Sequence, residues 1–215
     1  MTREMDVDRT GMTFTENWFC NRNLPTFREF VYPEWHGRPI VYLELGVFEG
    51  MSMVWMLQHV LTHEESRSVG IDPWLITTKI SEIQMQTVMD RTTKNLSRWT
   101  GLNCPSGKTK CILQRGNSAE VLRKMWKWKS FLGISPNSVD LCMIDGDHNS
   151  PAVLDDARSV YKLLKPGGWM LFDDVENDLP KRHHVQEGMQ QFLEEVGDGV
   201  SHLWKHKYME CYRKE

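Results

Sequence analysis

Apolar and polar positions follow two alternating patterns along the chain from about residue 40 onward. Short apolar runs predict buried strands, and longer segments with an apolar residue every three or four positions predict amphipathic helices. The predicted strands cover residues 40–45, 68–71, 110–114, 139–144 and 169–172, with one or two closing strands within 201–213. The predicted helices cover residues 52–62, 77–99, 119–128, 151–164 and 184–196. This repeated alternation predicts an α/β protein with a doubly wound, mostly parallel, Rossmann-like sheet of seven strands (or slightly truncated) and helices on both faces.

The segment that precedes the first predicted strand, residues 1–39, is too rich in aromatic residues for a disordered tail. We expect one or two short helices there, interrupted near Pro25 and Pro33. They could cap an edge of the sheet, cover a ligand cleft or form a homodimer contact. The length of 215 residues suits a single domain, with residues 1–39 as a helical cap and residues 40–215 as the core.

Composition and charge exclude several classes of protein. The chain is 40% hydrophobic and 26% charged, and its net charge of -3 gives no electrostatic indication of a nucleic-acid partner. No apolar run approaches the roughly 20 residues of a membrane span, and the polar N-terminus does not resemble a secretory signal. The five scattered cysteines contain no C-x-x-C pair, so neither a zinc site nor a disulfide framework is indicated. Reduced thiols in a cytoplasmic protein are the simplest interpretation.

The stretch VYLELGVFEG, residues 41–50, combines an apolar strand with two glycines and leads directly into a predicted helix. Gly46 and Gly50 would let the backbone turn tightly and approach a ligand closely, and the N–H groups at the helix start would face that ligand. An ordinary tight turn is the alternative interpretation. Because an α/β sheet often binds a nucleotide-like molecule at such a turn, the pattern predicts a cofactor site.

Asp72 closes the second predicted strand, about 20 residues after the glycine turn, and could accept hydrogen bonds from two ribose hydroxyls. Nicotinamide dinucleotides and S-adenosylmethionine (SAM) share that requirement. The spacing Gly46-x-x-x-Gly50 lacks the G-x-G-x-x-G arrangement that brings the backbone against a pyrophosphate. The glycine spacing therefore favours SAM, and a nicotinamide-dependent oxidoreductase remains the alternative from another class.

Polar residues follow all five main predicted strands, and the carboxyl ends of parallel strands meet at one edge of a sheet. Any single carboxylate there could be a solvated or helix-capping group. Three carboxylates after two neighbouring strands would suit Mg²⁺, Mn²⁺ or Ca²⁺. The polar residues at the strand ends are Glu44, Asp72, Asn117, Ser118, Asp145, Asp173 and Asp174.

Two further motifs carry candidate chemistry. His148 follows Asp145 by three residues and could remove a proton from a substrate hydroxyl, because its ordinary pKa near 6.5 suits a base at neutral pH. A surface or helix-capping histidine fits the spacing equally well. The run KMWKWK, residues 124–129, mixes basic and aromatic residues and could touch nucleic acid or an acidic partner, but a solvated helix end is the favoured interpretation.

These motifs together resemble those of class I SAM-dependent methyltransferases. Residues 43–52 resemble motif I, residues 70–73 the second motif, and residues 144–148, 163–168 and 172–174 the later motifs. The resemblance runs from about Tyr42 to Val175 and is closest to the methyltransferase-24 family. A more distant resemblance is to catechol O-methyltransferase and its metal-dependent relatives.

The resemblance implies roles for particular residues. In the catechol enzyme and its relatives, the serine equivalent to Ser52 lies near the SAM carboxylate, and the one equivalent to Ser118 contacts adenine. Their metal ligands match Asp145, Asp173 and Asp174. The implied cofactor-binding residues are Glu44, Gly46, Phe48, Gly50, Ser52, Asp72, Trp74, Asn117, Ser118 and Asp145.

The chain departs from that pattern at three positions. Asp174 stands where the metal-dependent relatives have asparagine, which is compatible with a metal but adds charge. His148 stands where the catechol enzyme has its lysine base, and some sugar and macrolide O-methyltransferases also use histidine. Met51 stands where the methyltransferase-24 group often has a basic residue.

The predicted activity is O-methylation of a hydroxyl on a small molecule or sugar, assisted by a divalent cation, with His148 and Asp145 as catalytic residues. Metal-independent methyl transfer to another acceptor is the alternative within the same class. A non-catalytic SAM-binding scaffold is a third interpretation, which the carboxylates after strands four and five argue against.

Overall fold

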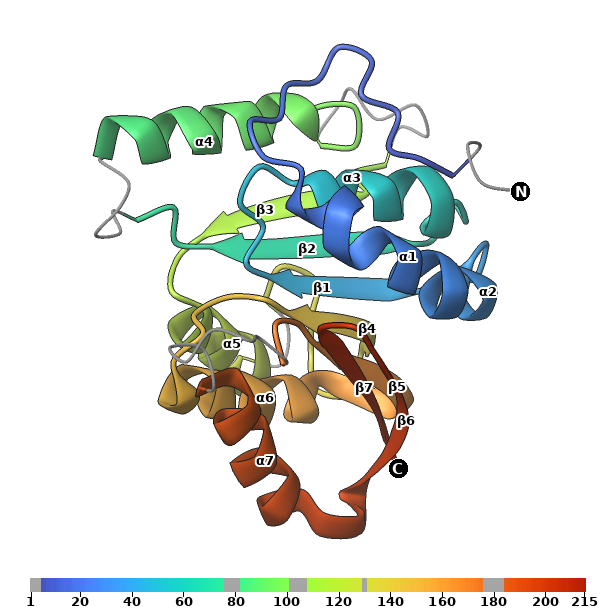
Figure 1. The fold of residues 1–215 in the computed structure, drawn as a ribbon, viewed down its shortest axis with the longest axis vertical. Helices are drawn as coiled ribbons and strands as arrows, with labels where there is room; N and C mark the ends of the chain where they lie inside the picture. The colour runs from blue at the N-terminus through green and yellow to red at the C-terminus, as the bar shows by residue number, and fades with distance from the viewer. Residues whose placement is uncertain (1–4, 76–81, 101–107, 129–130, 176–183) are drawn as a thin grey trace. The chain divides into compact units, whose positions relative to one another are not determined.

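The computed structural model describes residues 5–75, 82–100, 108–128, 131–175 and 184–215 of the chain (Figure 1). Its strands form one seven-stranded sheet in the order β3-β2-β1-β4-β5-β7-β6. Seven strands in this order confirm the predicted doubly wound, Rossmann-like class. The strands are β1 (Val41–Leu45), β2 (Arg67–Asp72), β3 (Cys111–Arg115), β4 (Val139–Ile144), β5 (Leu164–Phe172), β6 (Val200–His206) and β7 (Met209–Lys214).

The strand pairs are mostly parallel, as predicted. β4 pairs in parallel with β1 on one side and with β5 on the other, and β2 pairs in parallel with β3. β7 lies between β5 and β6 and runs antiparallel to both. β6 is the strand at that edge of the sheet. Almost every residue of β4 is buried, as expected for a strand that packs on both faces.

Contacts between residues divide the chain into two compact units. The first unit comprises Met1–Ile40 and Val47–Gly116, and the second comprises Val41–Gly46 and Asn117–Glu215. The prediction of a single domain stays a prediction. The helices of the first unit are η1 (Phe19–Asn23), α1 (Leu24–Thr26), η2 (Phe27–Val31), α2 (Tyr32–Trp35), α3 (Met51–Trp55), η3 (Met56–Val60) and α4 (Glu82–Asn95). Those of the second unit are α5 (Ser118–Lys127), α6 (Ser150–Leu163), α7 (His184–Val196) and the short η5 (Gly197–Gly199).

The N-terminal segment is helical from η1 through α2, and the two prolines do not interrupt it. Pro25 and Pro33 each occupy the first turn of an α-helical piece that follows a π-helical turn, where a missing N–H costs little. Phe27 packs edge-on against Trp55 of α3, at a distance of 5.7 Å between ring centroids. Both rings are completely buried, so the aromatic residues of this segment belong to the core of the first unit.

The helices of the second unit pack side by side, α5 against α6 and α6 against α7 (Figure 1). Gly188 lets α7 approach α6 closely, since a Cβ atom there would lie 2.4 Å from the carbonyl oxygen of Ser150. Within the described ranges, no helix combines the length and the apolar character needed to cross a membrane.

Candidate active site

The second half of the predicted glycine turn, from Val47 to Gly50, lies at the start of α3 in the first unit. Gly50 has a φ of 80° and its N–H donates to the carbonyl oxygen of Val47 at 2.8 Å. Phe48 also adopts a left-handed conformation, with a φ of 49°. Ser52 lies in the first turn of α3 and is mostly buried, with 9% of its surface exposed. The turn is therefore tight and leads directly into a helix start, as the sequence predicts.

Asp72 fastens this turn. Its Oδ2 accepts hydrogen bonds from the N–H groups of Val47 and Phe48, both at 2.9 Å, and its Oδ1 accepts one from the N–H of Trp74 at 2.7 Å. Burial raises the pKa of the Asp72 carboxyl, and the three N–H groups act in the opposite direction. Carboxylate oxygens have more lone pairs than these bonds use, so the side chain keeps capacity for a hydroxyl donor.

Trp74, two residues after Asp72, is a buried side chain that packs beside the glycine turn. Only 2% of its surface is exposed, and it packs with Val47, Met85 and Val88 in a small apolar cluster. Its indole N–H donates to the carbonyl oxygen of Phe48 at 3.0 Å. Trp74 therefore supports the glycine turn, and its predicted contact with the cofactor stays a prediction.

Glu49 is a structural residue of this turn that the sequence did not reveal. Its carboxylate accepts from the N–H and the hydroxyl of Thr15, at 2.6 and 2.8 Å, and pairs with the Nε of Arg91 at 2.7 Å. Asn95 donates to the Glu49 carbonyl oxygen at 3.0 Å. The turn is thus tied to both the N-terminal segment and α4, contacts that no local sequence pattern specifies.

In the second unit, Gly46 follows β1 directly and has a φ of 86°. A Cβ atom at this position would lie 1.8 Å from the carbonyl oxygen of Asp145, so only glycine fits. Glu44 is completely buried, and its Oε2 accepts from the hydroxyl of Tyr42 at 2.6 Å. The two residues that the sequence assigns to the cofactor thus have clear structural roles in the strand and its end.

Asn117 and Ser118 begin α5. The Asn117 side chain caps the helix by accepting from the N–H of Glu120 at 3.4 Å. Ser118 acts to lower the pKa of Asp156, a buried carboxylate of α6 that is not among the predicted site residues. No signal in the sequence marks Asp156, because it occupies a core-facing position of an ordinary amphipathic helix.

The second unit brings together three of the residues predicted for catalysis and metal binding. His148 Nε2 lies 3.4 Å from Asp145 Oδ1, and His148 Nδ1 lies 3.6 Å from Asp174 Oδ2. One ligand atom from each of the three residues lies within 4.8 Å of the others. Asp173 does not belong to this group: its N–H donates to the carbonyl oxygen of Ile144 at 3.1 Å, and its side chain is buried.

The chemistry of this group fits a divalent cation. Its two carboxylates suit Mg²⁺ or Mn²⁺, and the imidazole places a ring nitrogen beside them. The side chains of Asp145 and His148 remain 29% and 35% exposed, so a substrate atom could reach the group from solvent. Hydrogen bonding to Asp145 raises the pKa of the His148 imidazole, burial opposes this, and the charges of Asp145, Asp174 and Asp173 reinforce it.

The buried carboxyl of Asp156 makes folding depend on pH. Burial raises its pKa from 3.8 to about 6, against the hydrogen bond from Ser118. The folded protein holds this proton more tightly than the unfolded chain, so this group lowers stability as pH rises from about 4 to 6, by about 3 kcal/mol in total.

Asp156→Asn should remove that contribution. We expect the free energy of unfolding in urea, compared between pH 4 and pH 7, to shift in favour of pH 7 by about 2–3 kcal/mol relative to the wild type. Asp198→Asn, at an exposed position in η5, is the matched control and should leave the difference unchanged. The same pH dependence in Asp156→Asn and the wild type would contradict this assignment.

Comparison with known proteins identifies the family of the chain. A family described as a methyltransferase domain, methyltransferase-24, matches residues 43–175. The uncharacterised protein R132 of Acanthamoeba polyphaga mimivirus is 25% identical over 175 residues, which are 80% of this chain and 68% of that protein.

Two solved structures share the fold. A TDP-rhamnose 3'-O-methyltransferase of calicheamicin biosynthesis aligns with a TM-score of 0.60 and 16% identity, over 99% of this chain and 92% of that one. A methyltransferase of the mycinamycin biosynthetic pathway, in complex with Mg, S-adenosylhomocysteine (SAH) and mycinamycin VI, aligns with a TM-score of 0.55 and 13% identity, over 94% of this chain and 50% of that one. The matched family covers more than half of the chain and includes the glycine turn, Asp72 and the group formed by Asp145, His148 and Asp174. The chain belongs to the methyltransferase-24 family and is a SAM-dependent methyltransferase.

Proposed function

We propose that this methyltransferase transfers the SAM methyl group to a hydroxyl of a small molecule or sugar, with the help of a divalent cation. The observation that carries the proposal is the approach of His148 to both Asp145 and Asp174. A histidine between two carboxylates combines a proton acceptor with oxygen ligands for a cation. We take Mg²⁺ as the first candidate, with Mn²⁺ or Ca²⁺ as substitutes.

Each residue of the group has a role in this proposal. Asp145 and Asp174 would hold the cation, which would supply Lewis-acid chemistry that lowers the pKa of an acceptor hydroxyl. A ring nitrogen of neutral His148 takes the hydroxyl proton. The acceptor oxygen attacks the methyl carbon, the carbon–sulfur bond breaks, and SAH leaves as a neutral thioether. Positioning and electrostatics account for most of the rate.

Two features of the first unit support the binding of the methyl donor. Asp72 keeps hydrogen-bonding capacity for a ribose hydroxyl, and the turn from Val47 to Gly50 presents the start of α3. The acceptor class is drawn from the relatives: one acts on the rhamnose of a TDP-sugar, and the other is bound to mycinamycin VI with Mg. A small-molecule or sugar acceptor is therefore the partner we propose.

The test is a methyl-transfer assay with radiolabelled SAM against a panel of catechols, nucleotide-linked sugars and macrolide glycosides. We expect turnover on at least one acceptor, loss of that turnover in EDTA, and its return when Mg²⁺ is added in excess. Full activity in EDTA would overturn the metal part of the proposal and favour metal-independent transfer.

His148→Gln tests the base within the same assay. General-base catalysis typically contributes at least about 10² to a rate, so turnover should fall by that factor or more. His184→Gln is the matched control, because His184 lies at the exposed start of α7. A loss of less than about tenfold in His148→Gln would argue against the base role.

A further inference from the structure

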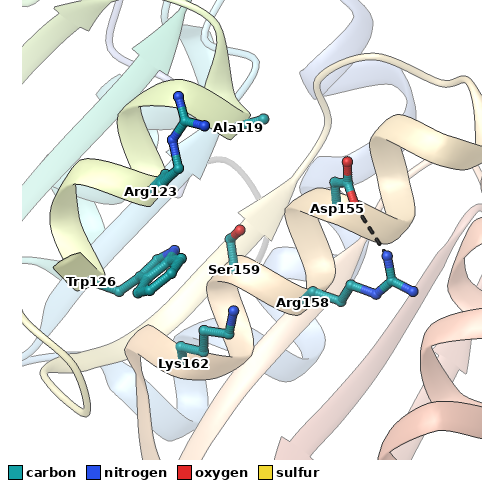
Figure 2. A pocket seen from close by; sticks show the side chains of 7 residues that line it. All are labelled: Ala119, Arg123, Trp126, Asp155, Arg158, Ser159 and Lys162. Carbon is teal, nitrogen blue, oxygen red and sulfur yellow. Dashed lines mark hydrogen bonds and ion pairs between the residues drawn. The ribbon is translucent and has the colours of Figure 1, made fainter.

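A basic cleft lies between α5 and α6, in the part of the second unit that the methyl-transfer proposal does not use. Figure 2 shows the side chains that line it. The cleft has a volume of 230 Å³, which is room for several water molecules of about 30 Å³ each but less than a typical drug-sized pocket. Its lining residues are Ala119, Arg123, Trp126, Asp155, Arg158, Ser159 and Lys162.

The cleft carries an excess of positive charge. The lining contains three cations, Arg123, Arg158 and Lys162, and one carboxylate, Asp155, which already pairs with Arg158 at 3.2 Å. Arg158 is further engaged by both oxygens of Glu195 on α7. Among the described residues, no carboxylate lies within ion-pair distance of Arg123 or Lys162. In the part of the chain that the structure describes, two cations of the cleft are therefore uncompensated.

The indole of Trp126 lines the cleft. It lies between the two helices, and Lys162 Nζ is 4.3 Å from the ring centroid, a cation–π contact that holds the ammonium in the cleft (Figure 2). The indole N–H is buried, and none of the described residues accepts a hydrogen bond from it. Ser159 contributes a hydroxyl on the facing helix. Apart from Asp155, the side-chain groups of the lining are thus rich in donors.

We propose that this cleft binds the phosphate group of a phosphate monoester. A phosphate monoester carries a charge of about -1.5 to -2 at pH 7, which matches the two uncompensated cations, and its oxygens accept several hydrogen bonds. A monocarboxylate would leave one cation unbalanced. Arginine and lysine are both common phosphate ligands, arginine through two parallel N–H groups and lysine as a point charge.

A nucleic acid is the competing occupant, because Lys124 and Lys127 of α5, and Trp128 directly after it, are exposed. A phosphodiester strand would need a basic stripe that extends beyond the cleft and would use these residues. The small volume of the cleft, and the presence in its lining of two cations with no carboxylate partner among the described residues, favour a small ligand with a terminal phosphate.

The test follows the indole N–H resonances of ¹⁵N-labelled protein at low ionic strength. Trp126→Phe identifies the Trp126 signal. We expect ribose 5-phosphate and inorganic phosphate to shift this signal saturably, whereas ribose leaves it in place. Arg123→Gln and Lys162→Gln should each weaken binding, and together by at least about tenfold, which is about 1.4 kcal/mol. Lys124→Gln, which removes the same charge one residue away on α5, should change the affinity less than about twofold.

Three results would overturn the proposal. The first is the absence of a saturable shift with either phosphate compound. The second is unchanged affinity in both single variants and in the double variant, each of which should keep the wild-type pattern of backbone resonances. The third is tighter binding of a single-stranded oligonucleotide that Lys124→Gln weakens as strongly as Arg123→Gln, which would assign the surface to nucleic acid.

Discussion

Gly46→Ala should lower the free energy of unfolding by more than about 4 kcal/mol, a loss that few single substitutions cause. The new Cβ would lie 1.8 Å from the Asp145 carbonyl oxygen and 2.5 Å from the carbonyl carbon. These are backbone atoms next to the end of β4, which is paired with β1 and β5, so they cannot move aside as a flexible side chain would. The φ of 86° adds the ordinary cost of a left-handed alanine.

Gly167→Ala separates these two effects. Gly167 also has a left-handed conformation, with a φ of 82°, but a Cβ there meets no atom within 4 Å. This variant should lose only about 1 kcal/mol, from the backbone conformation alone. Thermal or urea unfolding of both variants makes the comparison, and insoluble Gly46→Ala counts as severe destabilisation. Equal losses in the two variants would contradict the close approach of β1 and the loop after β4.

Asp174→Gly should reduce metal-dependent turnover by at least about 10², because it removes one of the two carboxylates that we propose for the cation. Glycine is the suitable replacement because Asp174 has a φ of 57°, which an alanine would not adopt without strain. The Mn²⁺ affinity measured by calorimetry should fall in parallel, since this readout does not need an acceptor.

Asp174→Asn is the matched variant. Asparagine tolerates the same left-handed backbone and keeps one oxygen that can bind a cation, as in the metal-dependent relatives of the family. We expect it to retain at least about a tenth of the turnover. If Asp174→Gly keeps the turnover and the Mn²⁺ affinity of the wild type, Asp174 is not a ligand of the metal. An equal loss in both variants would show that the charge of the carboxylate matters more than its oxygen ligand.

Hydrophobic periodicity was sufficient to predict the fold. The strand at residues 139–144 and the helix at residues 184–196 agree with β4 and α7, because long apolar stripes leave little choice of conformation. Element ends were less certain: β5 begins at Leu164, whereas its prediction starts at residue 169, since Pro166 and two glycines resemble a loop. Residues 77–81 of the helix predicted for residues 77–99 lie outside the described residues.

The candidate site could be predicted only in part. Asp145 and Asp174 follow neighbouring parallel strands, so their proximity is a consequence of topology. Consecutive side chains at a strand end point in different directions, which is why Asp174 joins His148 and Asp173 does not. Glu49 and Asp156 depend on contacts between segments far apart in the chain, and no spacing rule reveals such contacts.

The most direct test of the account is a calorimetric titration of SAM into the wild-type protein and into Asp72→Asn, with Mg²⁺ present. We predict saturable one-site binding of micromolar strength to the wild type, and at least about tenfold weaker binding to Asp72→Asn, which loses the charge that fastens the glycine turn. Asp147→Asn, an exposed neighbour of the metal group, should bind like the wild type. No heat at two temperatures, or equal affinity in Asp72→Asn, would contradict the assignment of this turn to the cofactor.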